Sequence, residues 1–336
     1  MTELVTDAVT ESMLPADIRI PPGTCVAIVA PGGYAPDEAA VGRGIALLEA
    51  QGCKVKSYYD HAARHQRFGA TDIGRAAHIQ QAAADPEVQI VMALRGAYGV
   101  SRILPALNYR ALAASGKLFI GYSDITALHL ALLAQTGAPG FAGPMLCSDF
   151  GTETPSAMTM NSFWRTMTQP TQTIKAVSAG NPTLKASGML WGGNLAMIVH
   201  LLGTPYFPQV DGGILFIEDV NEHPYRVERM LLQLEHAGVL ARQKAVLLGD
   251  FSNYRLSDYD NGYNFEQMLA YARQHLSAPL VTGLPFGHIP DRVTLPVGGH
   301  AELQADEGGF TLTLSGYPTV TSALSSASAP AKFTEA

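Results

Sequence analysis

The chain has 336 residues, of which 47% are hydrophobic and 15% charged, so it is long enough for two globular domains with substantial cores. Its formal net charge of −7 excludes the basic surface that binding to nucleic acid or to an anionic membrane requires. Small molecules or other proteins are therefore the expected partners.

The cysteines and the termini indicate where the protein works. Cys25, Cys53 and Cys147 show neither CxxC nor metal-ligand spacing, which favours a reducing compartment and a packing role. The first 18 residues contain no Lys or Arg, unlike a secretory signal, and no apolar stretch reaches the roughly 20 residues that cross a bilayer. We expect a cytoplasmic protein with disordered tails at residues 1–20 and 321–336.

The first half of the chain alternates between apolar strands and helices. Strands are expected at 24–30, 53–59, 88–94 and 117–122, and helices begin at Pro36, after a Thr71 cap, and at Asp124. Strands that are apolar throughout and separated by helices are typical of a parallel sheet covered on both faces. We predict a doubly wound, flavodoxin- or Rossmann-like α/β domain at residues 21–150.

The second half returns to this alternation after a polar connection at residues 151–185, in which 162–167 favours a short helix. A smaller C-terminal α/β domain is predicted at residues 186–320. Its last segments, 294–304 and 308–316, alternate between apolar and polar residues, which indicates antiparallel strands.

Ser123 lies where an expected strand turns sharply into an expected helix. This is the geometry of a nucleophile elbow, in which the backbone amide of the next residue, Asp124, can bind a developing oxyanion. The stretch lacks the second glycine of G-x-S-x-G, and a serine at this place is more often a helix N-cap. As a nucleophile, Ser123 needs a base and an acid from elsewhere.

Glu218 is a candidate acid, because it ends an expected strand at the sheet edge where α/β sites form. A salt bridge to Arg226 or Arg229 explains it equally well. His288 is the histidine that follows a strand in a Gly- and Pro-rich turn, GLPFGHIPDR, which holds an imidazole at the sheet edge rather than in a core. A single histidine so placed is more often structural than catalytic.

Two glycine-rich turns, APGGY at 30–34 and RGAYG at 95–99, follow strands and could bring backbone amides near a ligand. Neither matches G-x-G-x-x-G or the P-loop pattern, so a nucleotide site has little support.

Seven stretches resemble, in this order, the motif series of the serine LD-carboxypeptidases. They cover about residues 24 to 318 and read IVAPGGY, LRGAYGVSRIL, FIGYSDITALH, AGPM, LWGGNLAM, ILFIEDVNEHPYRVERMLLQLEHAG and GLPFGHIPDRVTLPVG. The resemblance implies a two-domain homodimer with a triad of Ser123, Glu218 and His288. It also implies an activity, the removal of the terminal D-alanine from murein tetrapeptides, free or attached to a sugar or UDP-sugar, during peptidoglycan recycling.

In that mechanism the backbone amides of Asp124 and Gly96 form the expected oxyanion hole. A guanidinium suits the substrate's terminal carboxylate, and Arg102 and Arg292 are candidates that the sequence does not rank against the others. Trp191 could line the pocket or belong to the core. The full set of substrate-binding candidates is Arg95, Tyr98, Trp191, Asn194 and Arg226. No metal or organic cofactor is expected, since serine supplies the nucleophile.

One departure from the family pattern is Ala97, which replaces a glycine of R-G-G-Y-G, so a positive φ there would be strained. Two alternative functions remain open. One is a same-fold serine peptidase of the microcin-immunity type, which cleaves peptidyl-nucleotide antibiotics. The other is an α/β module whose glycine-rich loops bind a nucleotide or a sugar.

Overall fold

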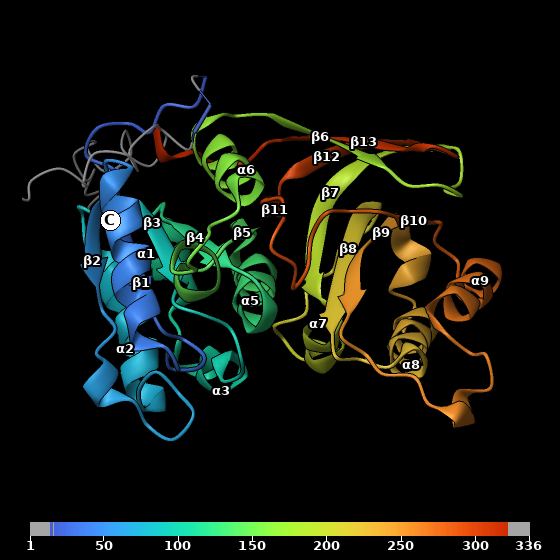
Figure 1. The fold of residues 1–336 in the computed structure, drawn as a ribbon, viewed down its shortest axis with the longest axis horizontal. Coiled ribbons are helices and arrows are strands. Elements are labelled where there is room, and N and C mark those ends of the chain that lie inside the picture. The colour runs from blue at the N-terminus through green and yellow to red at the C-terminus, as the bar shows by residue number, and fades with distance from the viewer. Residues whose placement is uncertain (1–13, 16, 322–336) are drawn as a thin grey trace, which may run out of the picture.

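The computed structural model describes residues 14, 15 and 17–321 (Figure 1). The predicted tails, 1–20 and 321–336, fall largely outside the described residues. Of the part that is described, Asp17 pairs with Arg165 at 2.8 Å and Ile18 is buried, so the chain ahead of the first strand packs against the body of the protein. No helix in the described ranges is both long enough and apolar enough to cross a membrane.

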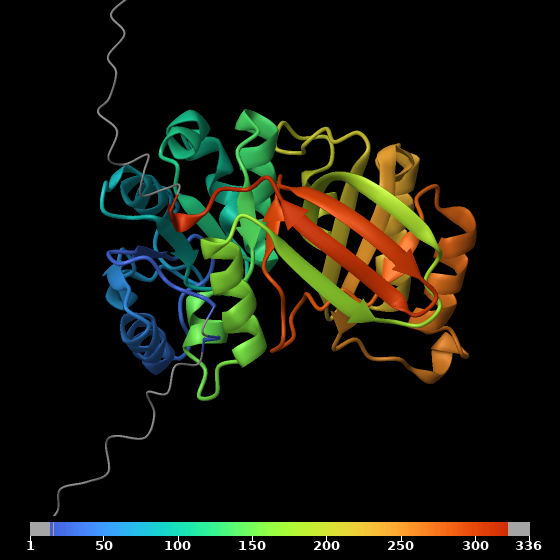
Figure 2. The same ribbon diagram turned by 90° about the horizontal axis from the view of Figure 1, so that it is seen from above.

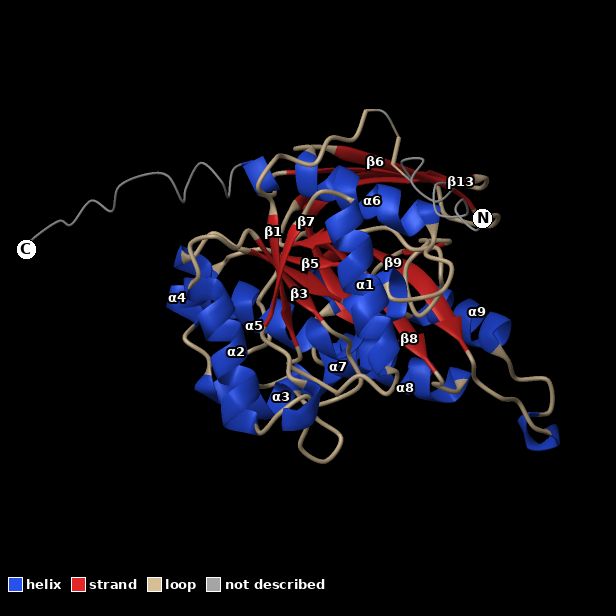
Figure 3. Ribbon diagram, turned by 60° about the vertical axis from the view of Figure 1, so that its left-hand side comes forward, coloured by secondary structure: helices blue, strands red, loops and turns tan. Residues whose placement is uncertain are grey.

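The first lobe is a six-stranded sheet with helices on both faces (Figures 1 and 3). Its strands are Cys25–Val29 (β1), Lys54–Ser57 (β2), Ile90–Ala93 (β3), Leu118–Gly121 (β4), Gly140–Ala142 (β5) and Leu295–Val297 (β11). Its helices are Glu38–Ala50 (α1), Asp72–Ala84 (α2), Val100–Ile103 (α3), Tyr109–Ala114 (α4) and Thr126–Thr136 (α5). The strand order is β11-β5-β4-β3-β1-β2, and every pair is parallel except β11 with β5. The predicted doubly wound sheet is thereby confirmed.

Local capping sets where the helices begin. Thr71 caps α2 as expected, its hydroxyl accepting the Gly74 amide at 3.2 Å. The helix predicted to open at Pro36 instead begins at Glu38, because the Asp37 carboxylate accepts the Ala39 amide at 3.0 Å and so makes Asp37 the N-cap.

The second lobe is a seven-stranded sheet in the order β10-β9-β8-β7-β12-β13-β6. Its strands are Gln172–Val177 (β6), Leu184–Asn194 (β7), Gly213–Val220 (β8), Gln243–Ser252 (β9), Leu280–Thr282 (β10), His300–Asp306 (β12) and Gly309–Ser315 (β13). The helices are Leu195–Leu201 (α7), Pro224–His236 (α8) and Phe265–His275 (α9). The strands from β10 to β7 are parallel, and those from β7 to β6 are antiparallel. In Figure 2 the antiparallel strands β12 and β13, drawn in red, lie across the face of this lobe.

The long strand β7 joins these two halves of the sheet. Residues 184–189 pair with β12, and their side chains alternate between partly buried and exposed. Residues 190–194 pair with β8 and are buried throughout. One strand therefore changes from a half-exposed antiparallel ladder to a fully covered parallel one along its length.

Two segments differ in structure from the predicted elements. The connection at 151–185 contains Ala157–Thr168 (α6), longer than the short helix expected there, and β6, which forms the edge of the second sheet. The single strand expected at 294–304 is two strands, because Gly298, with φ +98°, turns the chain between β11 in the first sheet and β12 in the second.

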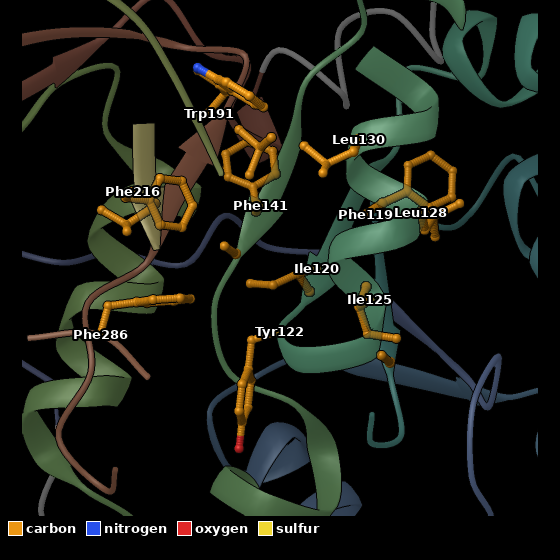
Figure 4. Packing of buried hydrophobic residues seen from close by; sticks show 14 of the residues in the cluster. Phe119, Ile120, Tyr122, Ile125, Leu128, Leu130, Phe141, Trp191, Phe216 and Phe286 are labelled. Carbon is orange, nitrogen blue, oxygen red and sulfur yellow. The ribbon is translucent and has the colours of Figure 1, made fainter. Parts of the chain in front are cut away.

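Apolar side chains of both lobes form one continuous core. In Figure 4, Ile120 and Phe141 of the first sheet lie beside Phe216, Phe286 and Trp191 of the second lobe. The carboxyl ends of β4 and β8, which carry Ser123 and Glu218, are therefore held by a shared apolar interface.

Candidate active site

Ser123 lies on a strained turn between β4 and α5. Tyr122 is extended, Ser123 has φ +63°, and the chain then passes through one 3₁₀ turn, Ser123–Ile125, into α5. Ser123 is partly exposed, whereas Tyr122 and Asp124 are buried. A left-handed backbone at a serine costs free energy, and at a strand-to-helix turn it is typical of a nucleophile elbow.

The 95–99 turn packs directly against this serine. A Cβ built on Gly96 would lie 2.8 Å from Ser123 Cβ and 3.0 Å from Ser123 Oγ, which is too close for a side chain, so glycine is required there. The Gly96 carbonyl accepts the Gly33 amide at 2.9 Å, which ties the two glycine-rich turns together. Ala97, which replaces a glycine of the family motif, has φ +75°, so its backbone is strained, as the sequence analysis stated for a positive φ at this position.

Glu218 and His288 form the hydrogen bond that joins two distant parts of the second lobe. Glu218 is fully buried at the carboxyl end of β8, and its Oε2 lies 2.8 Å from His288 Nδ1. The His288 side chain is 22% exposed, so the ring reaches the surface of the site while its Nδ1 edge is held inside. This bond fixes the tautomer in which Nε2 is available as a base.

The imidazole also contacts the lobe that carries Ser123. The His288 ring meets the Tyr122 ring edge-to-face, with 5.1 Å between centroids. Tyr122 directly precedes Ser123, so this contact lies one residue from the candidate nucleophile. In the described residues His288 is hydrogen-bonded to Glu218 and not to Ser123.

Two buried carboxylates near this place carry altered pKa values. Burial raises the pKa of Asp124 to about 6, although its Oδ2 accepts the Val100 amide at 2.9 Å. Burial, and then the neighbouring Glu218 charge, raise the pKa of Asp219 to about 6. Both carboxylates are buried, and the loss of solvation is the main cause of each shift.

Asn194, predicted to contact substrate, is 6% exposed and points into the protein. Its Nδ2 donates to Glu218 Oε1 at 3.2 Å and to Asp219 Oδ1 at 3.0 Å. Asn194 therefore bridges the two carboxylates and orients Glu218 from behind.

Trp191, for which the sequence left both a pocket wall and a core position open, lies in the core. It is fully buried, and its Nε1 donates to Gln243 Oε1 at 2.8 Å. The indole is a core residue of β7, because its one polar atom is already satisfied inside the second lobe.

The arginines proposed for carboxylate binding differ in their partners. Arg102 pairs with Asp72 at 2.8 Å, Arg226 lies 3.6 Å from Glu222 on the surface of α8, and buried Arg292 pairs with Asp149. Arg95, which precedes Gly96, is different: within the described ranges it pairs with no carboxylate, and its Nη1 donates to the Tyr34 carbonyl at 3.3 Å.

Tyr98, on the same turn as Arg95, is 42% exposed and packs against Phe68.

The sequence analysis did not predict the contacts that Asp149, Asp219 and Tyr122 make at this site. No local pattern signals them, because their partners lie far away in the chain. Among the residues that the structure describes, no group of three or more His, Cys, Asp or Glu side chains is arranged to hold a metal ion.

Comparison with known proteins places this chain among the peptidases. The model of the LD-carboxypeptidase N-terminal domain matches residues 26–143, and that of the LD-carboxypeptidase C-terminal domain matches residues 187–303. The chain therefore belongs to the LD-carboxypeptidase family, and it is a serine-type LD-carboxypeptidase.

Individual relatives agree with this assignment. The crystal structure of a muramoyltetrapeptide carboxypeptidase from Oxalobacter formigenes is 52% identical, with a TM-score of 0.85, and the match covers 88% of this chain and 100% of that one. The "Probable murein peptide carboxypeptidase" of Bacillus subtilis is 32% identical over 85% of this chain and 90% of its own.

A third relative is the microcin C7 self-immunity protein MccF of Escherichia coli, which is 26% identical over 81% of this chain and 87% of its own. Its structure in complex with glutamyl sulfamoyl guanosine has a TM-score of 0.80 at 24% identity and covers 89% of this chain and 98% of that one, a likeness of fold.

Proposed function

We propose that this enzyme removes the terminal D-alanine from murein tetrapeptides, L-Ala-D-Glu-meso-diaminopimelate-D-Ala, free or attached to a sugar or UDP-sugar. Its place would be peptidoglycan recycling in the cytoplasm, and the expectation of a homodimer belongs to the same proposal. The observation that carries it is the 2.8 Å bond between His288 and Glu218, with the imidazole packed against the residue that precedes Ser123.

This arrangement supports the following mechanism. His288 Nε2 takes the Ser123 hydroxyl proton as the oxygen attacks the carbonyl carbon, and Glu218 stabilises the positive charge that forms on the ring. The oxyanion is held by the backbone amides of Asp124 and Gly96. Collapse of the tetrahedral intermediate breaks the C–N bond, and His288 returns the proton to the leaving D-alanine amine.

Hydrolysis of the acyl-enzyme repeats these steps with water as the nucleophile. His288 removes a proton from water as its oxygen attacks the ester, and the Ser123 oxygen leaves with the proton that the imidazole holds. The shortened peptide and free enzyme result.

Arg95 is the arginine that we assign to the terminal carboxylate of the substrate. It is partly exposed beside Gly96, and its guanidinium has a weak neutral partner where Arg102, Arg226 and Arg292 have carboxylates. A guanidinium not already paired with an acid has the stronger free-energy gain on binding a substrate carboxylate.

Replacement of Ser123 by Ala tests the proposal directly. D-alanine release from the tetrapeptide should fall by at least ~1,000-fold, because the nucleophile is lost while the fold is kept. Thermal unfolding of the same preparation controls for misfolding. Unchanged D-alanine release would remove Ser123 from the mechanism.

The substrate class is tested separately, with wild-type enzyme. A murein tetrapeptide should be hydrolysed and an aminoacyl-sulfamoyl nucleoside should not; the reverse pattern would favour the microcin-immunity alternative. Calorimetric binding of a free nucleotide or sugar without hydrolysis of either compound would favour the binding-module alternative.

A further inference from the structure

Arg292 is the buried residue whose contacts surround the His288 backbone. It is 3% exposed, and its guanidinium donates from Nε to the Gly287 carbonyl at 3.0 Å and from Nη2 to the Ile289 carbonyl. These two carbonyls belong to the residues on either side of His288. One planar group therefore holds the turn that carries the imidazole from both sides.

The third contact of Arg292, which lies in the connection between β10 and β11, reaches the segment after β5. Its Nη1 pairs with Oδ1 of Asp149, which lies in the short turn Leu146–Phe150 after β5. Asp149 is itself buried, and its Oδ2 accepts the Met145 amide at 2.8 Å and the Ser148 hydroxyl at 3.0 Å. The carboxylate is thus fixed in the lobe that contains Ser123.

Tyr122 completes the arrangement. The guanidinium carbon of Arg292 lies 4.1 Å from the centre of the Tyr122 ring, a cation–π distance, and the same ring meets His288 edge-to-face. The partners of the Arg292 guanidinium therefore have three places. Gly287 and Ile289 flank His288, Tyr122 precedes Ser123, and Asp149 anchors the guanidinium to the first lobe.

We propose that Arg292 is a positioning residue, which sets the His288 imidazole relative to Ser123 by holding the Gly287 and Ile289 carbonyls and pairing with Asp149 of the first lobe. The inference rests on the proposed function, since it requires His288 to be the base. It also removes Arg292 from the candidates for the substrate carboxylate, because its donors are occupied inside the protein.

The geometry explains why arginine is needed. Lysine carries the same charge but has a single nitrogen, which cannot reach two backbone carbonyls and a carboxylate in three directions. Arg292→Lys should therefore preserve the ion pair with Asp149 and loosen the His288 turn.

The test compares Arg292→Lys with wild-type enzyme on the tetrapeptide. We expect kcat to fall about 10- to 100-fold with KM changed less than about threefold, because positioning acts on the chemical step and not on substrate binding. Arg165→Lys, which alters a surface pair with Asp17, is the matched control and should keep wild-type kcat. A raised KM with unchanged kcat would make Arg292 a substrate-binding residue and overturn the inference.

Chemical rescue distinguishes positioning from a merely structural role. Methylguanidinium added to Arg292→Ala should restore part of the lost kcat, since it can occupy the vacated space between the two carbonyls and Asp149. Folded Arg292→Ala with wild-type kcat would also overturn the inference.

If neither Arg292 variant folds, Asp149→Asn carries the test. It keeps both carbonyl contacts of Arg292 and removes the charge that ties them to the first lobe, so kcat should fall with KM unchanged; a wild-type kcat would count against the inference. Ser123→Ala separates the two proposals. If Ser123→Ala is inactive and Arg292→Lys has a normal kcat, the positioning role is refuted and the proposed function stands.

Discussion

At the scale of single residues, the site combines backbone strain with buried charge. Ser123 and Ala97 both have positive φ values, and their turns pack against each other around Gly96. Such conformations persist only where the surrounding structure imposes them. Here that structure includes the buried Asp124 carboxylate, which accepts the Val100 amide beyond the 95–99 turn.

Asp124→Asn should stabilise the protein at neutral pH and leave it nearly unchanged in acid. Burial raises the pKa of Asp124 to about 6 from its usual value of 3.8, so the folded state favours the protonated carboxyl. Stability from this group is therefore greatest below about pH 4 and is lost as the pH rises through 6. The amide avoids that loss and can still accept the Val100 amide.

The expected gain is roughly 1–3 kcal/mol at pH 7.5, measured by urea unfolding at pH 4.5 and 7.5. Exposed Asp258→Asn is the control and should show no such pH-dependent gain. An equal effect of Asp124→Asn at both pH values would mean that the carboxyl is ionised at each.

At the scale of elements, the carboxyl end of β7 connects the acid of the site to the helix that follows the nucleophile. The Asn194 amide donates to the Thr126 hydroxyl in the first turn of α5 at 3.0 Å, while the Asn194 side chain holds Glu218. Gly193 makes this approach possible, since a Cβ there would lie 2.4 Å from Thr126 Oγ1.

Gly193→Ala should destabilise the protein by more than ~2 kcal/mol and lower activity as well. The added methyl overlaps the Thr126 side chain, and φ +139° is unfavourable for alanine. Gly42→Ala is a matched control in α1, where a Cβ meets no atom within 4 Å. Chemical unfolding and D-alanine release measure both effects; a Gly193→Ala enzyme as stable and active as wild type would contradict this account of the β7–α5 contact.

At the scale of the whole molecule, the two lobes share one core, and the second half of the chain adds one strand to the first sheet. β11 lies in the first sheet although the strands before and after it, β10 and β12, lie in the second. The lobes should therefore unfold together, and the two tryptophans report on them separately. Trp164 donates to Gln51 at the end of α1, and Trp191 donates to Gln243 in β9.

Single-tryptophan variants test this cooperativity. In Trp164→Phe the remaining tryptophan, Trp191, reports on the second lobe. In Trp191→Phe the remaining tryptophan, Trp164, reports on the end of α1. Each variant should lose about 1–3 kcal/mol of stability. In each variant the fluorescence midpoint in urea should coincide with the midpoint from circular dichroism. Two separated transitions would show that the lobes unfold independently.

The order of strands and helices, the doubly wound first sheet and the strand-to-helix turn at Ser123 follow from the sequence, because hydrophobic periodicity and turn residues are local signals. The sequence also singled out Ser123, Glu218 and His288, by their places after strands and by the motif series. Their joint role in catalysis remains a proposal.

Only the tertiary structure decided which side chains meet. Trp191 and Asn194 carry no local mark that separates a core or supporting role from substrate contact, and β11 has no local signal for joining the other sheet. The Arg292–Asp149 pair joins residues 143 positions apart. Such contacts arise when distant segments pack into one core, and the spacing of residues along the chain does not encode them.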